Sequence, residues 1–221
     1  MTAKPVPYQL IIFDVDGTLI DSFALFTELL NNFSNKYGYE QIKGQRVEQL
    51  RALAPRQIRQ ALNLSLFSTL RLMYDCKKAM QQQQDMPMLF EGVAHLLEQL
   101  KDQGVLLAIV TSNSKENCLR YLGETLLPYF DWMECNASIY GKAKQIKKII
   151  QRSGCALHEV IYIGDQIIDV QSAHKNKIRS AAVTWGFNTE AALRRQHPHI
   201  VVQTIAQLEA LLLNKTVAHI A

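Results

Sequence analysis

The chain has 221 residues, of which 48% are hydrophobic and 20% are charged, and its formal net charge is +4. These values are typical of a soluble globular protein with a full core, and the mild positive charge suits a small anionic ligand better than nucleic acid, which requires a clustered basic face. The four cysteines show neither disulfide nor zinc spacing, and no signal-peptide pattern or membrane-spanning apolar run is found. We therefore expect a cytoplasmic protein with reduced thiols and with neither a nucleic-acid nor a membrane partner.

Residues 10–18 read Leu-Ile-Ile-Phe-Asp-Val-Asp-Gly-Thr and predict a buried strand that ends on acidic residues. Because side chains alternate along an extended chain, Asp14 and Asp16 point to the same side while Val15 points away. Gly17 then permits the backbone to turn. Two neighbouring carboxylates repel each other unless a cation or a shared proton lies between them, and a divalent cation with a phosphate ester would meet that need. A simple turn closed by Asp and Gly is the alternative.

The segment 19–88 predicts helices only. Apolar residues recur at helical spacing from Phe23 to Phe33, and Gly38 ends this first helix. Further amphipathic stretches follow as far as Met80, and the glutamine tract after it is typical of an exposed helix end. These residues are therefore predicted to form an all-helical domain inserted after the first strand.

From Leu89 onward, predicted strands and helices alternate. Such alternation predicts a parallel sheet with helices on both faces. The fold class is therefore α/β, a Rossmann-like doubly wound sheet built from residues 1–18 and 89–221. The later strands are predicted at 105–110, 131–135, 160–163, 180–185 and 200–202.

Polar residues close three of the predicted strands. Asp14, Thr111 and Asp165 each stand at the carboxyl end of a strand. In open parallel sheets ligands bind beyond these ends, where the strand order reverses. We therefore expect the three side chains to converge on one crevice.

Four stretches, taken together, resemble the motifs of the haloacid dehalogenase superfamily in its phosphatase branch. Asp-Val-Asp-Gly-Thr resembles the first motif, Val-Thr-Ser-Asn at 110–113 the second, and Gly-Asp-Gln-Ile-Ile-Asp at 164–169 the fourth. Gly-Lys-Ala-Lys at 141–144 stands where the family often has Lys-Pro in the third. The resemblance covers Leu10 to Leu213, is nearest to phosphoglycolate phosphatase-like enzymes, and implies that the helical insert is a C1-type cap domain.

The resemblance implies roles for the first two aspartates. Asp14 would be the nucleophile that forms an aspartyl-phosphate, and Asp16 would be the general acid and base. In the related dehalogenases the second position is not acidic, so Asp16 argues against cleavage of a carbon–halogen bond.

The resemblance also implies a Mg²⁺ site formed by Asp14, Asp165 and the backbone carbonyl of Asp16. Asp169 lies four residues after Asp165, and if a helix starts after the strand this spacing places both on one side. Asp169 is then either a ligand or a residue that orients one. Hard oxygen ligands suit Mg²⁺ rather than zinc. The alternatives are a helix N-cap for Asp165 and a favourable helix-dipole position for Asp169.

Phosphate binding is expected from the second and third motifs. The hydroxyl of Thr111 and the backbone N–H groups of Ser112 and Asn113 stand at a helix entrance, which favours anions, although a lone Thr there is often only a cap. Lys142 would neutralise the phosphate and the nucleophile, and Lys144 is its rival. From the cap, Arg56 and Arg59 are candidate substrate contacts, although exposed arginines on helices are usually only solvated. The Trp185-Gly186-Phe187 stretch is expected to serve packing.

The resulting hypothesis is a Mg²⁺-dependent phosphatase acting on a small phosphorylated metabolite through Asp14 and Asp16. One alternative is a phosphomutase of the β-phosphoglucomutase type, which would return the phosphoryl group to a sugar. Another is a non-catalytic binding protein on the same scaffold, against which the intact acidic pair argues.

Overall fold

A six-stranded parallel sheet forms the centre of the computed structural model, which describes residues 6–137 and 141–214. Its strand order, β3-β2-β1-β4-β5-β6, places β1 and β4 side by side at the point where the order reverses. The predicted α/β class and all six predicted strands are confirmed. The strands are β1 (Leu10–Phe13), β2 (Leu106–Val110), β3 (Trp132–Glu134), β4 (Val160–Gly164), β5 (Arg179–Val183) and β6 (Ile200–Val202).

The fifth strand is shorter than predicted. It ends at Val183 rather than at Trp185, because the chain turns there toward the first motif. The indole N–H of Trp185 donates a hydrogen bond of 3.2 Å to the carbonyl of Thr18. The residues that follow Val183 therefore cover the acidic end of the sheet.

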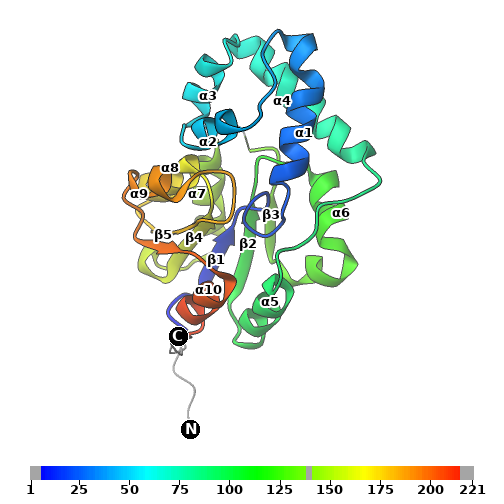
Figure 1. Cartoon of the computed structure of the whole chain (residues 1–221). Helices are drawn as coiled ribbons and strands as arrows, with labels where there is room; N and C mark the ends of the chain where they lie inside the picture. Colours follow the sequence, from blue (N-terminus) through cyan, green and yellow to red (C-terminus); the bar gives the residue numbers. More distant parts are fainter. Residues whose placement is uncertain (1–5, 138–140, 215–221) are drawn as a thin grey trace, which may run out of the picture.

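Helices cover both faces of the sheet (Figure 1). In β1, Ile11 and Phe13 belong to the core shared with α5, α6 and α10, whereas Leu10 and Ile12 belong to the core shared with α7 and α8. Burial on both faces explains why the strand is apolar throughout. The helices of the core are α5 (Val93–Asp102), α6 (Lys115–Leu126), α7 (Lys142–Ser153), α8 (Ile167–Lys175), α9 (Glu190–Arg194) and α10 (Ile205–Leu212).

The predicted helical insert lies above the carboxyl ends of the strands (Figure 1). Gly38 ends its first helix in the left-handed conformation, with φ 74°, as expected for a glycine at that position. This first helix packs against the fourth. The insert consists of α1 (Phe23–Tyr37), α2 (Gln45–Arg51), α3 (Pro55–Ala61) and α4 (Leu66–Gln82).

Two adjacent segments connect the insert to the sheet. The N–H of Asp21 donates to the carbonyl of Met88 at 2.8 Å, and the N–H of Phe90 donates to the carbonyl of Leu19 at 3.0 Å. The segment that leads from the sheet into the insert and the segment that leads back therefore lie side by side. Both lie near the predicted ends of the inserted domain, residues 19 and 88, and these domain boundaries stay a prediction.

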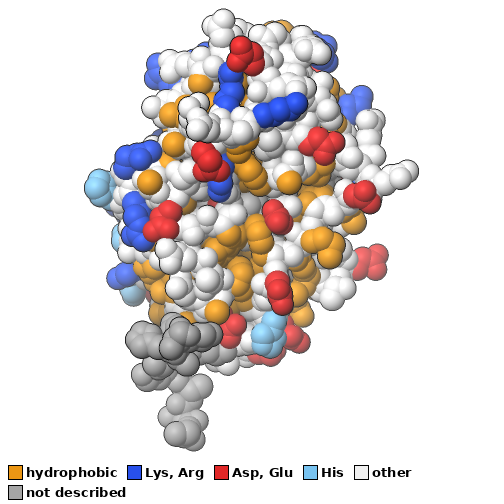
Figure 2. Space-filling view, in the orientation of Figure 1, with side chains coloured by type: hydrophobic (Ala, Val, Ile, Leu, Met, Phe, Trp, Pro, Cys, Tyr) orange, Lys and Arg blue, Asp and Glu red, His pale blue; other side chains and the backbone are white. Residues whose placement is uncertain are grey.

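The surface carries charges of both signs. Figure 2 shows Lys and Arg side chains interspersed with Asp and Glu on the face in view. Among residues 6–137 and 141–214, no helix combines the length and hydropathy needed to cross a membrane.

Candidate active site

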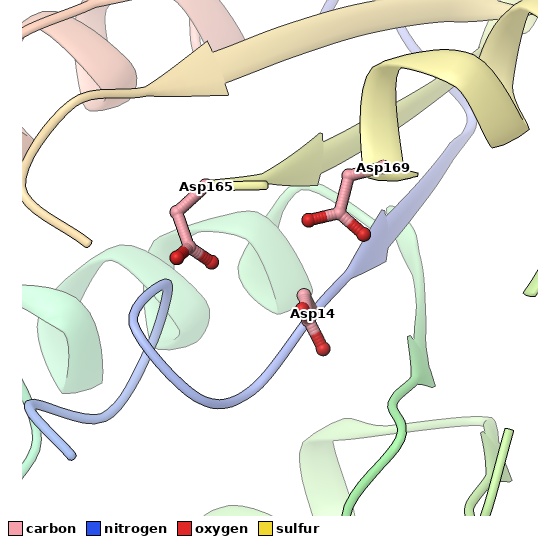
Figure 3. Close-up of side chains that lie close together, drawn as sticks. All are labelled: Asp14, Asp165 and Asp169. Atoms are coloured by element: carbon pink, nitrogen blue, oxygen red, sulfur yellow. The ribbon is translucent and has the colours of Figure 1, made fainter. Parts of the chain in front are cut away.

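Three buried aspartates meet at the carboxyl edge of the sheet. Asp14 follows β1, Asp165 follows β4, and Asp169 lies in the first turn of α8. Each offers a carboxylate oxygen, and these oxygens all lie within 4.8 Å of one another. Figure 3 shows the three side chains arranged around one space. The switch point of the sheet thus brings together residues separated by about 150 positions.

The helix after β4 begins later than the four-residue spacing of Asp165 and Asp169 predicts. Gln166 is its N-cap, so Asp165 stands before the helix and not on it. Asp169 nevertheless turns back toward Asp165, because one of its oxygens accepts the N–H of Gln166 at 2.9 Å. This capping interaction explains the proximity of the two carboxylates.

The first residue of α7, Lys142, places its ammonium group between two of these carboxylates. Its Nζ lies 2.5 Å from Oδ2 of Asp14 and 2.6 Å from Oδ1 of Asp169, and its side chain is 2% exposed. Burial alone would lower the pKa of Lys142, but the two carboxylates together raise it above its ordinary value. Lys142 is therefore positively charged. The rival residue, Lys144, is exposed to solvent.

Asp165 has hydrogen bonds but no bonded cation among the described residues. Its carboxylate accepts the hydroxyl of Thr18 and the backbone N–H of Phe187, both at 2.7 Å. Burial, followed by the charges of Asp14 and Asp169, raises the pKa of Asp165 well above its ordinary value. The three carboxylates thus outnumber the single ammonium group of Lys142, and a further cation would relieve their repulsion.

This arrangement fits Mg²⁺. The three side chains offer only carboxylate oxygens, which are hard ligands preferred by Mg²⁺. Asp169 is also engaged by Lys142 and by the hydroxyl of Tyr162, at 3.3 Å. Its contacts suit a residue that orients Lys142 as well as one that binds the metal.

Asp16 lies in the turn after β1 with one carboxylate oxygen bonded and one free. Oδ2 accepts the side-chain amide of Asn113 at 2.8 Å, whereas Oδ1 is buried without a hydrogen-bond partner among the described residues. Burial, with a smaller contribution from the charge of Asp14, raises the pKa of Asp16 to about 6. A carboxyl group with such a pKa can both donate and accept a proton near neutral pH.

The loop after β2 supplies polar groups beside this turn. The hydroxyl of Thr111 accepts the N–H of Asn113 at 3.0 Å. Ser114 caps α6 by accepting the N–H of Asn117 at 3.1 Å, as the sequence predicts. Ser112 and Asn113 line the same cavity as Asp16 and Lys142. Thr111 is fully buried and does not contribute to that lining, so it supports the loop from beneath.

Two glycines allow the backbone to approach Asp165 closely. At Gly17, which has φ +75°, an added Cβ would collide with the Asp165 carboxylate and with the ring of Phe187. At Gly186, an added Cβ would collide with the side chain of Asp165. At both positions a larger residue would therefore clash with Asp165. At Gly17 the positive φ is a second reason for glycine, because other residues rarely adopt it.

Hydrogen bonds that the sequence does not predict form a clasp between the core and the cap. Asn188 accepts the N–H of Ile167 at 2.9 Å and donates to the carbonyls of Arg51 and Leu53 at 2.6 and 3.1 Å. Arg51 in turn donates to the carbonyls of Gly186 and Phe187 at 2.9 and 3.1 Å. We call Asn188, Arg51 and Leu53 the clasp. It links the cap to the same loop that donates a hydrogen bond to Asp165.

The two cap arginines named as candidate substrate contacts lie in different surroundings. Arg59 lines the cavity between cap and core and donates to the carbonyl of Leu64 at 3.1 Å. Arg56 is exposed and is not part of the cavity lining. No local pattern pointed to Arg51, because its partners are about 135 residues away.

Comparison with known proteins agrees with this geometry. Residues 11–183 match the model of the haloacid dehalogenase-like hydrolases. The phosphoglycolate phosphatase of Synechococcus elongatus is 33% identical over 208 residues, which cover 90% of this chain and 95% of that protein. The phosphoglycolate phosphatase of Agrobacterium fabrum is 27% identical, with 99% and 97% covered. A predicted phosphatase from Clostridium acetobutylicum has the same fold, with a TM-score of 0.79, 24% identity and coverage of 94% and 99%.

The chain therefore belongs to the haloacid dehalogenase-like hydrolases. Its relatives place it among the phosphatases of that family, and within them it is phosphoglycolate phosphatase-like, with a helical insert consistent with a C1-type cap.

Proposed function

We propose that the protein is a Mg²⁺-dependent phosphomonoesterase that acts on a small phosphorylated metabolite through an aspartyl-phosphate on Asp14. The supporting observation is the buried ammonium group of Lys142, bonded to Asp14 within a cluster of three carboxylates. Such a cluster concentrates opposite charges where a phosphoryl group would be transferred.

The metal would be held by Asp14, Asp165 and Asp169 or the carbonyl of Asp16, and when bound it offsets negative charge on the phosphoryl group. Lys142 offsets charge on the same group and holds Oδ2 of Asp14. Repulsion between the nucleophile and the phosphate is thereby reduced as they approach each other.

In the first step, a carboxylate oxygen of Asp14 attacks phosphorus. The new bond from oxygen to phosphorus forms while the bond to the leaving alcohol breaks. Asp16 donates its proton to the departing oxygen, for which a pKa of about 6 is suited. The products of this step are the alcohol and the aspartyl-phosphate.

In the second step, Asp16 accepts a proton from a water molecule that attacks the same phosphorus atom. The bond to Asp14 then breaks, which releases phosphate and restores both carboxyl groups. Ser112 and Asn113 line the space that the phosphate would occupy. Since the N–H of Asn113 is bonded to Thr111, Ser112 is the better placed donor of this loop.

The test is release of phosphate from p-nitrophenyl phosphate with and without Mg²⁺. Asp14→Asn should abolish turnover while the circular dichroism spectrum and the unfolding midpoint show a folded protein. Asp21→Asn, an exposed aspartate near the same turn, is the matched control and should keep full activity.

Retained turnover in Asp14→Asn would exclude Asp14 as the nucleophile. Conversion of a sugar phosphate to an isomer without release of free phosphate would instead favour a phosphomutase. Complete inactivity of the wild-type chain on a broad panel of phosphate esters, with Mg²⁺ present, would favour a binding protein.

A further inference from the structure

A cavity of about 230 Å³ extends from Asp16 and Lys142, beside the acidic cluster, into the cap. At one end its lining includes Asp16, Asn113 and Lys142, which belong to the proposed catalytic site. The rest of the cavity is formed mainly by the insert. The leaving group of a phosphate ester held at Lys142 would therefore lie against the cap.

The wall supplied by the cap is overwhelmingly apolar. Side chains from α1, α2, α3 and α4 all contribute to it. An alcohol hydroxyl or a carboxylate placed among such groups would lose its hydration without gaining a partner, which is unfavourable. An apolar group would gain from leaving water. Six of these wall residues are Phe26, Leu30, Leu50, Ile58, Leu72 and Met73.

The arginines on the wall are already engaged by the protein. Arg51 donates to two carbonyls, pairs with Glu48 at 2.9 Å and lies over the ring of Phe23. Arg59 donates through one of its nitrogens to the carbonyl of Leu64 at 3.1 Å. Arg51 is thus tied to the core, and Arg59 is tied to the cap by one hydrogen bond.

Lys77 is a cation of the cavity lining that favours an anionic rather than an apolar leaving group. It lines the cavity and is half-buried; burial lowers its pKa, and the nearby charge of Asp16 opposes that effect. The side-chain amide of Asn117 donates to the carbonyl of Lys77 at 3.4 Å and to Oδ1 of Asn113 at 2.8 Å, which places Lys77 toward the phosphoryl end of the cavity. A very small acid, such as the glycolate of phosphoglycolate, could reach it there.

We propose that the preferred substrate is a phosphate monoester whose alcohol part is apolar and no larger than one ring or a short aliphatic chain. This inference rests on the proposed phosphatase function. An apolar cavity of about 150 Å³ is large enough to hold benzene, so 230 Å³ accommodates a ring with a substituent. The cap then selects by shape and hydrophobicity, and the core performs the chemistry.

The experiment compares kcat/KM for methyl, ethyl, butyl, hexyl and phenyl phosphate with kcat/KM for 2-phosphoglycolate and glucose 6-phosphate. Each methylene that fits an apolar pocket is worth about tenfold or more in selectivity. We therefore expect kcat/KM to rise about 100-fold from ethyl to butyl phosphate, which differ by two methylenes, and the value for butyl phosphate to exceed that for 2-phosphoglycolate.

Substitutions in the cavity wall test whether this cavity causes the dependence of kcat/KM on the alcohol part of the substrate. Ile58→Phe adds volume to the wall from α3 and should reduce kcat/KM for hexyl and phenyl phosphate about tenfold while sparing methyl phosphate. Leu66→Phe, on the exposed side of α4 at 59% exposure, is the matched control and should change neither. If Ile58→Phe does not fold, Val47→Leu replaces it, because this substitution adds only a single methylene to the wall and is expected to act in the same direction.

A kcat/KM that does not change with the length of the alkyl chain would overturn the apolar-substrate inference and leave the phosphatase function intact. The same holds if 2-phosphoglycolate is the best substrate and Lys77→Met lowers kcat/KM for it selectively. An Ile58→Phe variant that affects methyl and hexyl phosphate equally would also overturn it. Absence of phosphate release from every ester, or activity that survives Asp14→Asn, would instead overturn the proposed function.

Discussion

The core and the cap differ in how completely their side chains are buried. All four residues of β1 are fully buried, whereas α1 buries only Leu29 and Ser34 completely, and α3 buries no residue completely. The acidic cluster is thus attached to strands packed on both faces. The apolar cavity, in contrast, is lined by helices with few fully buried positions.

Because of this difference, the core holds its charged groups at fixed positions, whereas the cap is expected to change conformation more easily. Phosphoryl transfer requires charged groups at fixed positions, and the parallel sheet supplies them. Segments with little buried apolar surface open at lower free-energy cost than a core strand does. The helical insert is therefore expected to open more readily than the sheet that holds the carboxylates. The clasp at Asn188 is one of the places where the two regions meet, and Arg120, which donates to the carbonyls of Gln81 and Gln83, is another.

The largest expected effect is removal of the buried cation of the core. Lys142→Met should lower kcat/KM by about 10³-fold and the free energy of unfolding by about 3–5 kcal/mol, because Asp14 and Asp169 lose their shared partner. Steady-state kinetics and urea unfolding measure these effects. Lys144→Met, at the exposed position two residues later, should change neither quantity. An equal loss of activity in both variants would contradict the assignment of Lys142.

A second substitution tests whether the core needs close contact around Asp165. Gly17→Ala should raise the Mg²⁺ concentration required for half-maximal activity about 10- to 100-fold, since the new Cβ collides with Asp165. Gly104 is the matched control, because its φ of +73° is nearly the same but its surroundings are open. Gly104→Ala should lose stability without any change in Mg²⁺ dependence. The same Mg²⁺ shift in both variants would show that backbone strain, and not contact, is responsible.

The clasp is expected to have an intermediate effect. Asn188→Ala should cost about 2 kcal/mol of unfolding free energy, because the N–H of Ile167 and two cap carbonyls lose a buried partner. It should also raise KM several-fold more than it lowers kcat, since cap placement affects binding before chemistry. Hydrogen exchange at residues 51–53 should accelerate.

Asn176→Ala is the control for the clasp. Asn176 also donates two hydrogen bonds, to the carbonyls of Ala143 and Ser172 at 2.9 Å, but both lie within the core. A similar loss of stability with an unchanged KM is expected. If KM rises equally in both variants, the clasp has no special part in positioning the cap.

The smallest effect is expected inside the cap. Lys36, followed by Tyr37, lowers the pKa of Asp75 by bonding to its carboxylate. A carboxyl group with a depressed folded-state pKa stabilises the protein above its unfolded pKa of about 4, and this contribution disappears as the pH falls through the folded value. Asp75→Asn should therefore slightly lower the urea midpoint at pH 7 and have a smaller effect at pH 3, below the unfolded pKa. A decrease of equal size at both pH values would exclude this electrostatic cause.

The fold could be predicted to a large extent because its signals are local. The apolar run of β1, the glycine after α1 and the alternation of strands with helices each act within a few residues. The end of β5 was misplaced because the departure of Trp185 from the sheet depends on Thr18, which lies far away in the sequence.

The residues of the candidate site and their convergence could be predicted from their motifs, but most of their individual contacts could not. The sequence favoured Lys142 and left Lys144 as its rival, whereas the structure places Lys142 between two carboxylates and Lys144 in solvent. The clasp was missed entirely, because a backbone carbonyl that accepts a hydrogen bond is present at every position and leaves no mark in the sequence.

Periodic hydrophobicity and chain-turning glycines by themselves determined an open parallel sheet with a helical insert, since burial and backbone conformation act over short stretches of chain. Only the tertiary structure decided which charges share one buried space, how the cap is fastened to the core and what kind of side chains line the cavity between them. These properties depend on distances between residues remote in sequence, which are set when the strands align and the helices pack.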